Sequence, residues 1–356
     1  MRIFACHLLN DYSGSPKVLK QLINGWVKNR KNVTILTCYN RDGFLSNING
    51  VNYSNYWYKW SSNNLVRLVN YFLSQIILFL KISKLVTKND IVYINTILPF
   101  GAALAAKLKG CKVIYHVHEI SIKPRILNWF LFKIVSLSSS RVIYVSNYLK
   151  NSVFSKLKNN IILYNALDDV FLREALKYNK EKSLQQNVLM ISSLKIYKGV
   201  NEFVELAKLN PQLNFRLVLN ANQSEIDVFF KEGNITENLK IYPTQLNTHP
   251  FYQWADVILN LSRPDGWIET FGLTIIEAMA YKLPAIVPPI GGISELVSDY
   301  ENGFLVDSRN MKLLSNTLNL LLKDKSLYEK MRIKSFYKLK EFSETEFIGK
   351  SMQSLN

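Results

Sequence analysis

Short apolar runs rich in β-branched residues alternate with longer helical patterns along almost the whole chain. The first six expected strands are Arg2–Cys6, Asn32–Cys38, Asp90–Asn95, Lys112–His118, Arg141–Ser146 and Asn160–Leu163. The second six are Asn187–Ser192, Phe215–Asn220, Leu239–Tyr242, Asp256–Leu261, Pro284–Val287 and Phe304–Val306. Nearly continuous apolar strands between helices are typical of a parallel sheet covered on both faces. The alternation therefore predicts an α/β protein with two doubly wound, Rossmann-like domains.

The polar segment from Asp168 to Gln186 has no strong strand pattern, so we expect the linker between the domains there. This gives an N-terminal domain over residues 1–167 and a C-terminal domain over residues 168–342. A length of 356 residues also favours two domains over one. In open α/β sheets ligands bind beyond the carboxyl ends of the strands, so a cleft between two facing domains is the expected site.

The excess of basic over acidic residues lies almost entirely in the first half of the chain. Residues 1–165 have a formal net charge of +18 and residues 166–356 have one of −1. A one-sided positive field suits an anionic partner, such as nucleic acid, lipid headgroups or a phosphorylated substrate. A solvated lysine-rich surface is the simpler interpretation of the same charge.

Cysteine usage and hydropathy indicate the compartment. Cys6, Cys38 and Cys111 are odd in number and far apart in apolar stretches, which argues against disulfides and for a reducing environment. The apolar run after Met1 is too short for a signal peptide. The most apolar long run, Leu68–Leu80, has 13 residues, so no transmembrane helix is expected.

The strongest local signal is a pair of carboxylates, Glu269 and Glu277, eight positions apart around a Gly-containing loop that opens an apolar helix. If that helix begins near Phe271, the backbone N–H groups of Phe271, Gly272 and Leu273 lie at its positive end, which suits a phosphate. Carboxylates accept hydrogen bonds from sugar hydroxyls. From spacing alone, Glu269 could equally be a partner of the helix dipole and Glu277 an ordinary helical residue.

This carboxylate pair, with Phe-Gly after the first Glu, resembles the motif of the retaining nucleotide-sugar glycosyltransferases of family 4. Further matching pieces are Gly14, His118-Glu119, Val145-Ser146, Asn165–Asp168, Lys198-Gly199, Gly291-Gly292, Glu295, Asn302-Gly303 and Val306-Asp307. The resemblance implies the GT-B fold and transfer of a sugar from a nucleoside diphosphate with retention at the anomeric carbon. It also implies that a final helix, over residues 343–356, packs back on the N-terminal domain.

By the same resemblance, Glu277 should bind the ribose of the donor, Glu269 the transferred sugar and Lys198 the departing diphosphate, where negative charge builds up. No metal and no other cofactor is implied. The family commonly has an Arg where this chain has Ser193. Because a Ser cannot grip a diphosphate as an Arg does, Lys195 is our candidate for restoring the charge, and weak donor binding is the rival interpretation.

Two candidate residues lie in the N-terminal half. His118 ends an expected strand and shares a face with His116 by the period of two. The family places such a histidine against the donor sugar, whereas a buried structural histidine is the alternative. Gly14 follows the first strand, where the missing Cβ permits a phosphate or an acceptor to approach, and an ordinary turn glycine is the alternative.

The family resemblance suggests a role in acceptor binding for the basic N-terminal half, because the N-terminal domain of such enzymes usually receives the acceptor. Segments 65–88 and 123–135 mix Lys with Leu, Ile, Phe and Trp, which suits helices at a membrane interface, although buried core helices fit as well. We therefore expect a lipid-linked oligosaccharide acceptor of O-antigen or capsule synthesis. The enzyme would be cytoplasmic and bound peripherally to the anionic inner face of the membrane.

Two other classes of function remain as alternatives. A nucleic-acid-binding protein is suggested by charge alone, without any recognisable motif, so we expect no nucleic acid partner. A GT-B nucleotide-sugar epimerase or a non-catalytic sugar-nucleotide-binding protein is kept open by Ser193. Neither the donor base and sugar nor the acceptor linkage can be predicted from these motifs.

Overall fold

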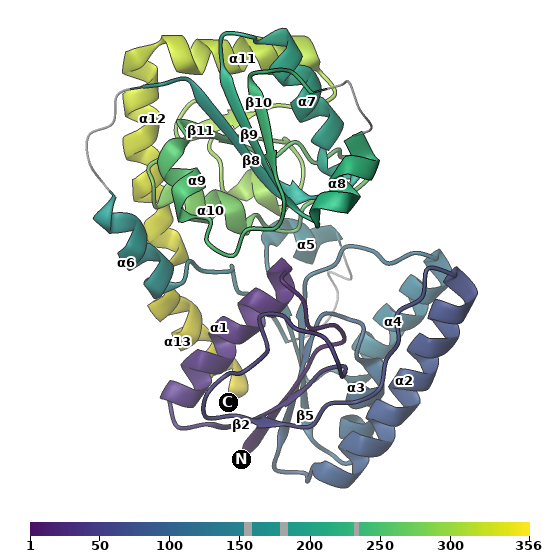
Figure 1. The fold of residues 1–356 in the computed structure, drawn as a ribbon. Helices are drawn as coiled ribbons and strands as arrows, with labels where there is room; N and C mark the ends of the chain where they lie inside the picture. Colours follow the sequence, from purple (N-terminus) through teal and green to yellow (C-terminus); the bar gives the residue numbers. More distant parts are fainter. Residues whose placement is uncertain (153–158, 179–183, 231–234) are drawn as a thin grey trace. The chain divides into compact units, whose positions relative to one another are not determined.

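The computed structural model describes residues 1–152, 159–178, 184–230 and 235–356. These residues divide into two compact units, which are Met1–Asn165 with Thr345–Asn356 and, separately, Ala166–Glu344. Each unit contains its own sheet of parallel strands with helices on both faces (Figure 1). The predicted fold class, two parallel-sheet α/β domains, is confirmed.

Within its described residues, unit 1 has a seven-stranded sheet of order β3-β2-β1-β4-β5-β6-β7. The strands are β1 (Arg2–Cys6), β2 (Asn32–Leu36), β3 (Asn52–Tyr53), β4 (Ile91–Asn95), β5 (Lys112–Val117), β6 (Arg141–Tyr144) and β7 (Asn160–Ile162). All neighbours pair in parallel, with Ile3 of the central strand β1 between Val33 and Ile91. Strands β1, β4 and β5 are almost wholly buried, which explains their continuous apolar sequences.

The helices of unit 1 are α1 (Gly14–Lys28), α2 (Asn64–Leu85), α3 (Phe100–Leu108), α4 (Arg125–Ser138), α5 (Asn147–Ser152) and the C-terminal α13 (Glu344–Leu355). Helix α1 covers one face of the sheet, and α2, α3 and α4 lie on the other (Figure 1). Helix α13 is held against α1, because Trp26 Nε1 donates to Ser351 Oγ at 3.1 Å. Arg141 at the start of β6 also donates to the Ser354 carbonyl at 2.7 Å.

Within its described residues, unit 2 has a six-stranded parallel sheet of order β10-β9-β8-β11-β12-β13. The strands are β8 (Asn187–Ser193), β9 (Asn214–Asn220), β10 (Leu239–Tyr242), β11 (Val257–Leu259), β12 (Ala285–Val287) and β13 (Gly303–Leu305). The α-helices are α6 (Asp169–Lys177), α7 (Val200–Leu209), α8 (Gln223–Phe230), α9 (His249–Trp254), α10 (Leu273–Met279), α11 (Met311–Lys323) and α12 (Lys325–Lys338). Short 3₁₀ segments occupy Ile196–Lys198, Gly292–Glu295 and Leu339–Phe342.

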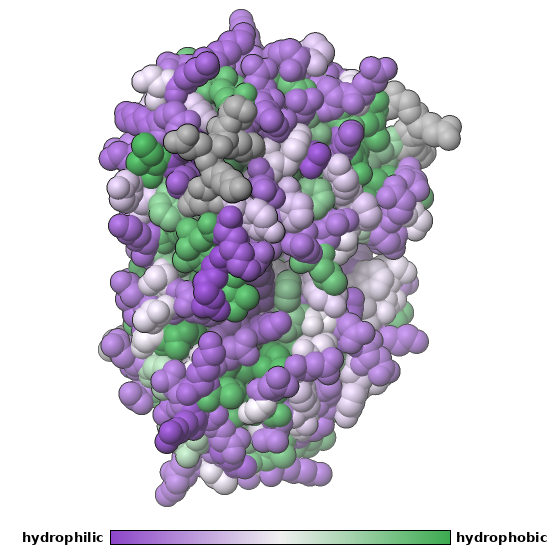
Figure 2. Space-filling model, turned by 60° about the vertical axis from the view of Figure 1, so that its left-hand side comes forward, coloured by the Kyte–Doolittle hydropathy of each residue, from purple (hydrophilic) through white to green (hydrophobic). Residues whose placement is uncertain are grey.

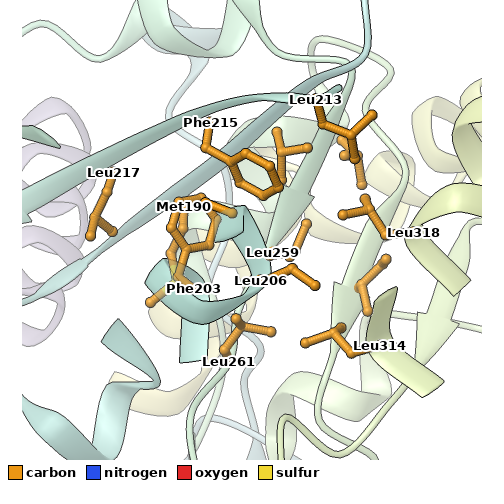
Figure 3. Close-up of a cluster of buried hydrophobic side chains, with 14 of the residues drawn as sticks. Met190, Phe203, Leu206, Leu213, Phe215, Leu217, Leu259, Leu261, Leu314 and Leu318 are labelled. Atoms are coloured by element: carbon orange, nitrogen blue, oxygen red, sulfur yellow. The ribbon is translucent and has the colours of Figure 1, made fainter. Parts of the chain in front are cut away.

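The core of unit 2 lies between one face of this sheet and helices α7 and α11. Phe203 and Leu206 of α7 meet Met190, Phe215 and Leu217 of the sheet, and Leu314 and Leu318 of α11 close the cluster (Figure 3). These side chains are fully or almost fully buried. Since burying such a side chain contributes roughly 1.5–3 kcal/mol, the cluster fixes the sheet and the loops that leave its carboxyl edge.

The twelve predicted strands are confirmed to within two residues at either end. Strand β3 was not predicted, because it has only two residues, both exposed at the sheet edge. The first half of the predicted linker at Asp168–Gln186 forms helix α6, because the Asp168 carboxylate accepts hydrogen bonds from the N–H groups of Val170 and Phe171. Residues 179–183 of that linker lie outside the described residues.

Helix α2 matches the segment 65–88 in which a helix was expected. It extends over 22 residues, and its most apolar stretch of 18 residues has a mean hydropathy of 1.6. By length and composition alone it could cross a membrane, which the run of 13 residues did not suggest. Elsewhere, as on the face drawn in Figure 2, hydrophobic residues in green lie between more numerous hydrophilic residues in purple.

Candidate functional site

Each sheet has one point at which the strand order reverses direction, and loops that leave such a point form the usual ligand site of an open α/β sheet. In unit 1 it lies between β1 and β4, and in unit 2 between β8 and β11. Most of the predicted site residues follow one of these strands or a neighbour of it. The two points are described in turn.

In unit 2, the turn after β8 places Lys198 at the end of a single 3₁₀ turn, Ile196–Lys198. Gly199 ends that turn in the left-handed region, with φ of +78°, and a Cβ there would lie 2.1 Å from the Leu261 carbonyl oxygen. Both features require glycine. The backbone is thus pressed against the loop after β11, and Lys198 is held close to that loop.

The Lys198 ammonium forms an ion pair with the Glu269 carboxylate. Ser262 Oγ, from the same loop as Glu269, donates to Glu269 Oε1 at 3.1 Å. The exposed fractions of the Lys198 and Glu269 side chains are 17% and 19%, so the pair is mostly buried but still reachable by a ligand. This pairing, between residues 71 positions apart, brings together two of the residues that the sequence predicted for the site.

Two aromatic side chains border this pair. The Trp267 ring lies 5.6 Å from Lys198 Nζ, within the range of a cation–π contact. Tyr197 stacks on Trp267, with ring centroids 5.8 Å apart and an angle of 26° between the planes. Flat aromatic faces beside a carboxylate and an ammonium can pack against the apolar faces of a sugar or a base.

The neighbouring cations differ in availability. Lys195 is exposed one turn before Lys198. Ser193 is the last residue of β8, so a longer side chain at this position would start from the carboxyl edge of the sheet. Arg263, the one arginine of the loop after β11, is engaged with the carboxylates of Glu202 at 3.6 Å and Asp265 at 3.3 Å. Lys195 is therefore the more exposed cation here, whereas Lys198 and Arg263 are both held in ion pairs.

Helix α10 begins at Leu273, two residues later than the expected start near Phe271. Phe271 is instead buried, with its ring centroid 5.8 Å from that of Phe342. Gly272 is needed for packing, because a Cβ at this position would lie 2.9 Å from Ile293 Cγ1. Ile293 therefore occupies the space on the side of Gly272 where a Cβ would lie.

Glu277 lies in the second turn of α10 and is buried. Its Oε2 atom accepts a hydrogen bond of 2.6 Å from the hydroxyl of Tyr252 in α9. Burial raises the pKa of the Tyr252 phenol well above its usual value, so the phenol stays protonated and remains a donor. Tyr252 therefore fixes the orientation of a carboxylate that family resemblance assigns to the donor ribose.

In unit 1, three histidines gather around the amide of Asn95 at the end of β4. His118 Nε2 lies 3.0 Å from Asn95 Oδ1, and His7 Nδ1 lies 3.1 Å from Asn95 Nδ2. The rings of His116 and His118 have centroids 4.3 Å apart, as the period of two predicted. Asn95 Nδ2 also donates to the Ser15 carbonyl at 3.1 Å, next to Gly14, the first residue of α1. Asn95 thus links His118 to the first turn of α1, beside Gly14.

The histidines of this cluster are held neutral. Burial lowers the pKa of His7 to about 4 and that of His116 to about 3, and it also lowers the pKa of His118 well below its ordinary value. Burial raises the pKa of Glu119, the residue after His118, to about 7. Around neutral pH the three histidines are therefore neutral hydrogen-bonding groups, while Glu119 is partly ionised.

The backbone at this point is strained. Thr96, directly after Asn95, has φ of +71°, a region that β-branched residues rarely adopt. The strained turn carries the Ile97 N–H toward Glu119, whose Oε2 accepts from it at 3.3 Å. Strain of this kind often accompanies functional loops. Among the described residues of the chain, no group of three or more His, Cys, Asp or Glu side chains is arranged to hold a metal ion.

Sequence reasoning missed Asn95, Tyr252 and Ser262. Asn95 could have been found, because it is a polar residue at the carboxyl end of an apolar strand next to the reversal point. Tyr252 and Ser262 reach Glu277 and Glu269 across 25 and 7 positions, and no spacing rule connects them. Their roles depend on how α9 and the β11 loop pack.

Comparison with known proteins identifies the class of enzyme. A family model described as "Glycosyltransferase Family 4" matches residues 12–169, and one described as "Glycosyl transferases group 1" matches residues 173–336. The chain is a glycosyltransferase of these two families. Their junction falls within α6, so the first model covers β2 to β7 of the unit 1 sheet and the second covers the whole sheet of unit 2.

Relatives and solved structures agree with this. N-acetyl-alpha-D-glucosaminyl L-malate synthase of Bacillus anthracis is 26% identical over 68% of each chain, and an uncharacterized glycosyltransferase of Methanocaldococcus jannaschii is 25% identical over 67% of each. A crystal structure of HepE from Anabaena in complex with UDP-glucose matches 100% of this glycosyltransferase and 99% of HepE, with a TM-score of 0.79 and 19% identity. The fold is accordingly the GT-B fold of glycosyltransferases.

Proposed function

We propose that this glycosyltransferase moves a sugar from a nucleoside diphosphate to an acceptor hydroxyl with retention at the anomeric carbon. The observation that carries the proposal is the ion pair of Lys198 and Glu269 at the strand-order reversal of unit 2. A cation suited to a diphosphate and a carboxylate suited to sugar hydroxyls stand there side by side. Crystal structures of HepE in complex with UDP and with UDP-glucose support a nucleotide-sugar donor.

In this proposal the diphosphate of the donor replaces Glu269 as the ion-pair partner of Lys198. The diphosphate draws the Lys198 ammonium away from Glu269, and the freed carboxylate accepts hydrogen bonds from the sugar being transferred. Ser262 keeps Glu269 oriented when Lys198 turns away. Glu277, oriented by Tyr252, binds the ribose hydroxyls, and the backbone at Phe271, Gly272 and Leu273 lies beside the diphosphate.

The reaction proposed is substitution on the front face of the sugar. The bond between the anomeric carbon and the diphosphate oxygen breaks, and the acceptor oxygen bonds to the same face of that carbon. The leaving diphosphate takes the proton of the acceptor hydroxyl, so no side chain has to act as base. Lys198 and Lys195 stabilise the negative charge that develops on the diphosphate, and the proposal includes no metal.

Unit 1 would supply the acceptor side and part of the sugar site. His118, neutral and held by Asn95, can exchange hydrogen bonds with a sugar hydroxyl, and Gly14 lies at the start of the adjoining helix. The net charge of +18 over residues 1–165 suits an anionic acceptor. We propose a lipid-linked oligosaccharide of O-antigen or capsule synthesis, used at the cytoplasmic face of the membrane.

The experiment that tests this function is a donor screen followed by product analysis. Thermal unfolding is measured with UDP, GDP, ADP, dTDP and their common sugars, since a ligand at about 100 times its Kd stabilises by about 2.7 kcal/mol. The selected donor is then incubated with lipid-linked acceptors, and the new linkage is examined by NMR. A product with the anomeric configuration of the donor is expected, also in the presence of EDTA. Conversion of the nucleotide sugar without an acceptor would instead identify an epimerase.

A further inference from the structure

Helix α2 exposes most of its apolar side chains, and its buried side is mixed, with Tyr71, Ser74 and Gln75 beside Leu78 and Ile82. Leu65 is 76% exposed, and Val69 and Ile76 are each 57% exposed. Further exposed apolar residues on the same side are Val66, Phe72, Leu73, Ile77 and Leu80. A surface helix of a globular protein ordinarily has the opposite arrangement. At 1.5 Å per residue, the apolar side from Leu65 to Leu80 is about 22 Å long.

The orientation of α2 is fixed by specific contacts. Its buried side includes Tyr71, Ser74 and Gln75. The Tyr71 hydroxyl donates to the Leu98 carbonyl at 2.6 Å, and the Gly101 N–H donates to Gln75 Oε1 at 3.1 Å. Turning the apolar side inward would break these bonds and leave buried polar groups unpaired, which costs about 1–3 kcal/mol each. The exposed apolar side is thus part of the folded unit.

Helix α4 continues the same surface. Its exposed residues include Ile126 at 81% and Trp129 and Leu137 at 64% each. The two helices meet where the rings of Phe72 and Phe130 lie 6.0 Å apart, and Figure 1 shows α2 and α4 on the same face of the sheet. We call this surface the α2–α4 face; it comprises Leu65, Val66, Val69, Phe72, Leu73, Ile76, Ile77, Leu80, Ile126, Trp129, Phe130 and Leu137.

The segments that carry and border the α2–α4 face are basic throughout. Residues 51–88 and 120–138 contain eight Lys and Arg residues and no Asp or Glu. Trp57 and Trp60 of the bordering segment are exposed as well, and the Arg67 guanidinium lies 5.7 Å from the Trp60 ring. Tryptophan and basic residues at the margin of an apolar surface are typical of contact with lipid headgroups.

We infer that the α2–α4 face docks on an anionic lipid bilayer, with α2 lying along the interface. Charge complementarity selects this occupant, because a second copy would bring two positive surfaces together, and a nucleic acid offers nothing for the exposed Leu, Ile and Trp side chains. A membrane-spanning position would strip Tyr71 and Gln75 of their partners in the α3 region. Lipid contact therefore covers the apolar face while the opposite side of α2 stays packed on the protein.

Vesicle binding tests the inference without any assay of transfer, so its outcome is independent of the proposed function. The full-length protein is sedimented with vesicles of phosphatidylcholine alone and with vesicles containing about one third phosphatidylglycerol. Binding is expected to be at least about tenfold stronger to the anionic vesicles and to weaken at high salt. Tryptophan fluorescence quenched by brominated lipid, and less so in Trp129→Phe, would place α4 at the bilayer.

The decisive variant is V69Q/I76Q, which makes the apolar side of α2 polar while keeping good helix formers. Its matched control is V228Q/I333Q, which replaces exposed Val and Ile residues of helices α8 and α12 in unit 2. The first variant is expected to bind anionic vesicles about tenfold or more weakly and to keep its melting temperature, and the control to bind like the wild type.

Three results with the wild type and the double variants would overturn the inference. They are a wild-type protein that binds neither kind of vesicle, equal loss of binding in both double variants, and a concentration-dependent dimer that V69Q/I76Q abolishes. The last result would assign the α2–α4 face to a second copy of the chain. Binding to nucleic acid that competes with the vesicles would likewise contradict a dedicated lipid surface.

Discussion

The two strand-order reversals of this glycosyltransferase have the same topology and opposite chemistry. The reversal in unit 2 carries an ammonium and two carboxylates, Lys198, Glu269 and Glu277, two of them joined in an ion pair. The reversal in unit 1 carries neutral groups, the imidazoles of His7 and His118 joined through Asn95. The two sheets place their site residues in equivalent positions. The identity of the loop residues therefore makes the reversal of unit 2 suited to a charged ligand and that of unit 1 suited to hydroxyl groups.

The difference is the reverse of what net charge suggests. The half with +18 presents neutral groups at its reversal point, and the half with −1 presents the cation proposed to hold a diphosphate. In unit 1 the excess charge includes the residues that border the α2–α4 face, away from the site itself. The net charge of a domain therefore indicates its partner surfaces better than it locates its anion site.

The largest effect is expected from removing the cation of unit 2. Lys198→Ala leaves the charge on the departing diphosphate without its ammonium, so kcat should fall about 100- to 1,000-fold, as measured by release of the nucleoside diphosphate. Lys195→Ala is the matched control, because its exposed ammonium is more strongly screened, and a loss below about tenfold is expected. Equal losses in the two variants would remove the special role of Lys198.

Acid should destabilise unit 1 before unit 2. A histidine with a folded pKa below its unfolded value of about 6.5 contributes stability that is complete above pH 6.5 and is lost as pH falls toward the folded pKa. With a pKa of about 4 for His7 and about 3 for His116, each loses about 2 to 3 kcal/mol by pH 4.5. The fourth histidine of the chain, His249, lies in unit 2.

Glu119 has the opposite effect on the stability of unit 1 as pH falls. Its folded pKa of about 7 means that its contribution to stability is complete below about pH 4.5 and is lost as pH rises through 7, which offsets about 2 to 3 kcal/mol of the loss on acidification. Together His7, His116 and Glu119 should give a net loss in unit 1 of about 2 to 3 kcal/mol between pH 7 and 4.5. His118, whose pKa burial also lowers, adds to this loss, and Glu119→Gln should make it larger. Hydrogen exchange of the β4 and β8 amides at both pH values measures it. Equal protection of both strands at pH 4.5 would contradict the neutral cluster.

A smaller effect is expected from the residue that orients Glu277. Tyr252→Phe removes one hydrogen bond to a buried carboxylate, so the donor should bind about tenfold more weakly. Tyr281→Phe is the matched control, because the Tyr281 hydroxyl is bonded to His249 Nδ1 at 2.5 Å and its ring stacks on Tyr252. Nucleotide titration by calorimetry should show no change for the control, and a tenfold loss there as well would mean that packing, not orientation, is measured.

The smallest change is expected at the position where the family commonly has arginine. Ser193→Arg adds a guanidinium near Lys195 and Lys198, and nucleoside diphosphate affinity should rise by less than about tenfold, because two cations are already present. A gain above about 100-fold in the same titration would show that the two lysines contribute little to diphosphate binding.

The buried strands of the fold were predictable from the sequence, whereas an exposed edge strand and one charged helix were not. Buried parallel strands such as β1 and β4 have continuous apolar sequences, and their bounds followed from that pattern. The edge strand β3, with two exposed residues, has no such pattern. Helix α6 was masked by its charged sequence, although Asp168 is an N-cap that could have revealed it.

The candidate site was predictable as a set of residues but not as an arrangement. Family resemblance selected Lys198, Glu269 and Glu277, while the pairing of the first two depends on Gly199 pressing one loop against Leu261. The start of α10 was placed two residues early, because the packing of Gly272 on Ile293 cannot be seen in the sequence. Contacts between loops depend on tertiary packing, which local patterns do not encode.

The most direct test of the assignment of the nucleotide to unit 2 is calorimetric titration with the nucleoside diphosphate that the donor screen selects. Wild type, Glu277→Ala and His118→Ala are compared. The nucleotide without its sugar should bind wild type and His118→Ala equally, and about 100-fold more weakly or not at all to Glu277→Ala, where charge-assisted hydrogen bonds to the ribose are lost. Binding unaffected by Glu277→Ala but lost in His118→Ala would place the nucleotide in unit 1 and contradict the assignment of the donor to the charged reversal point of unit 2.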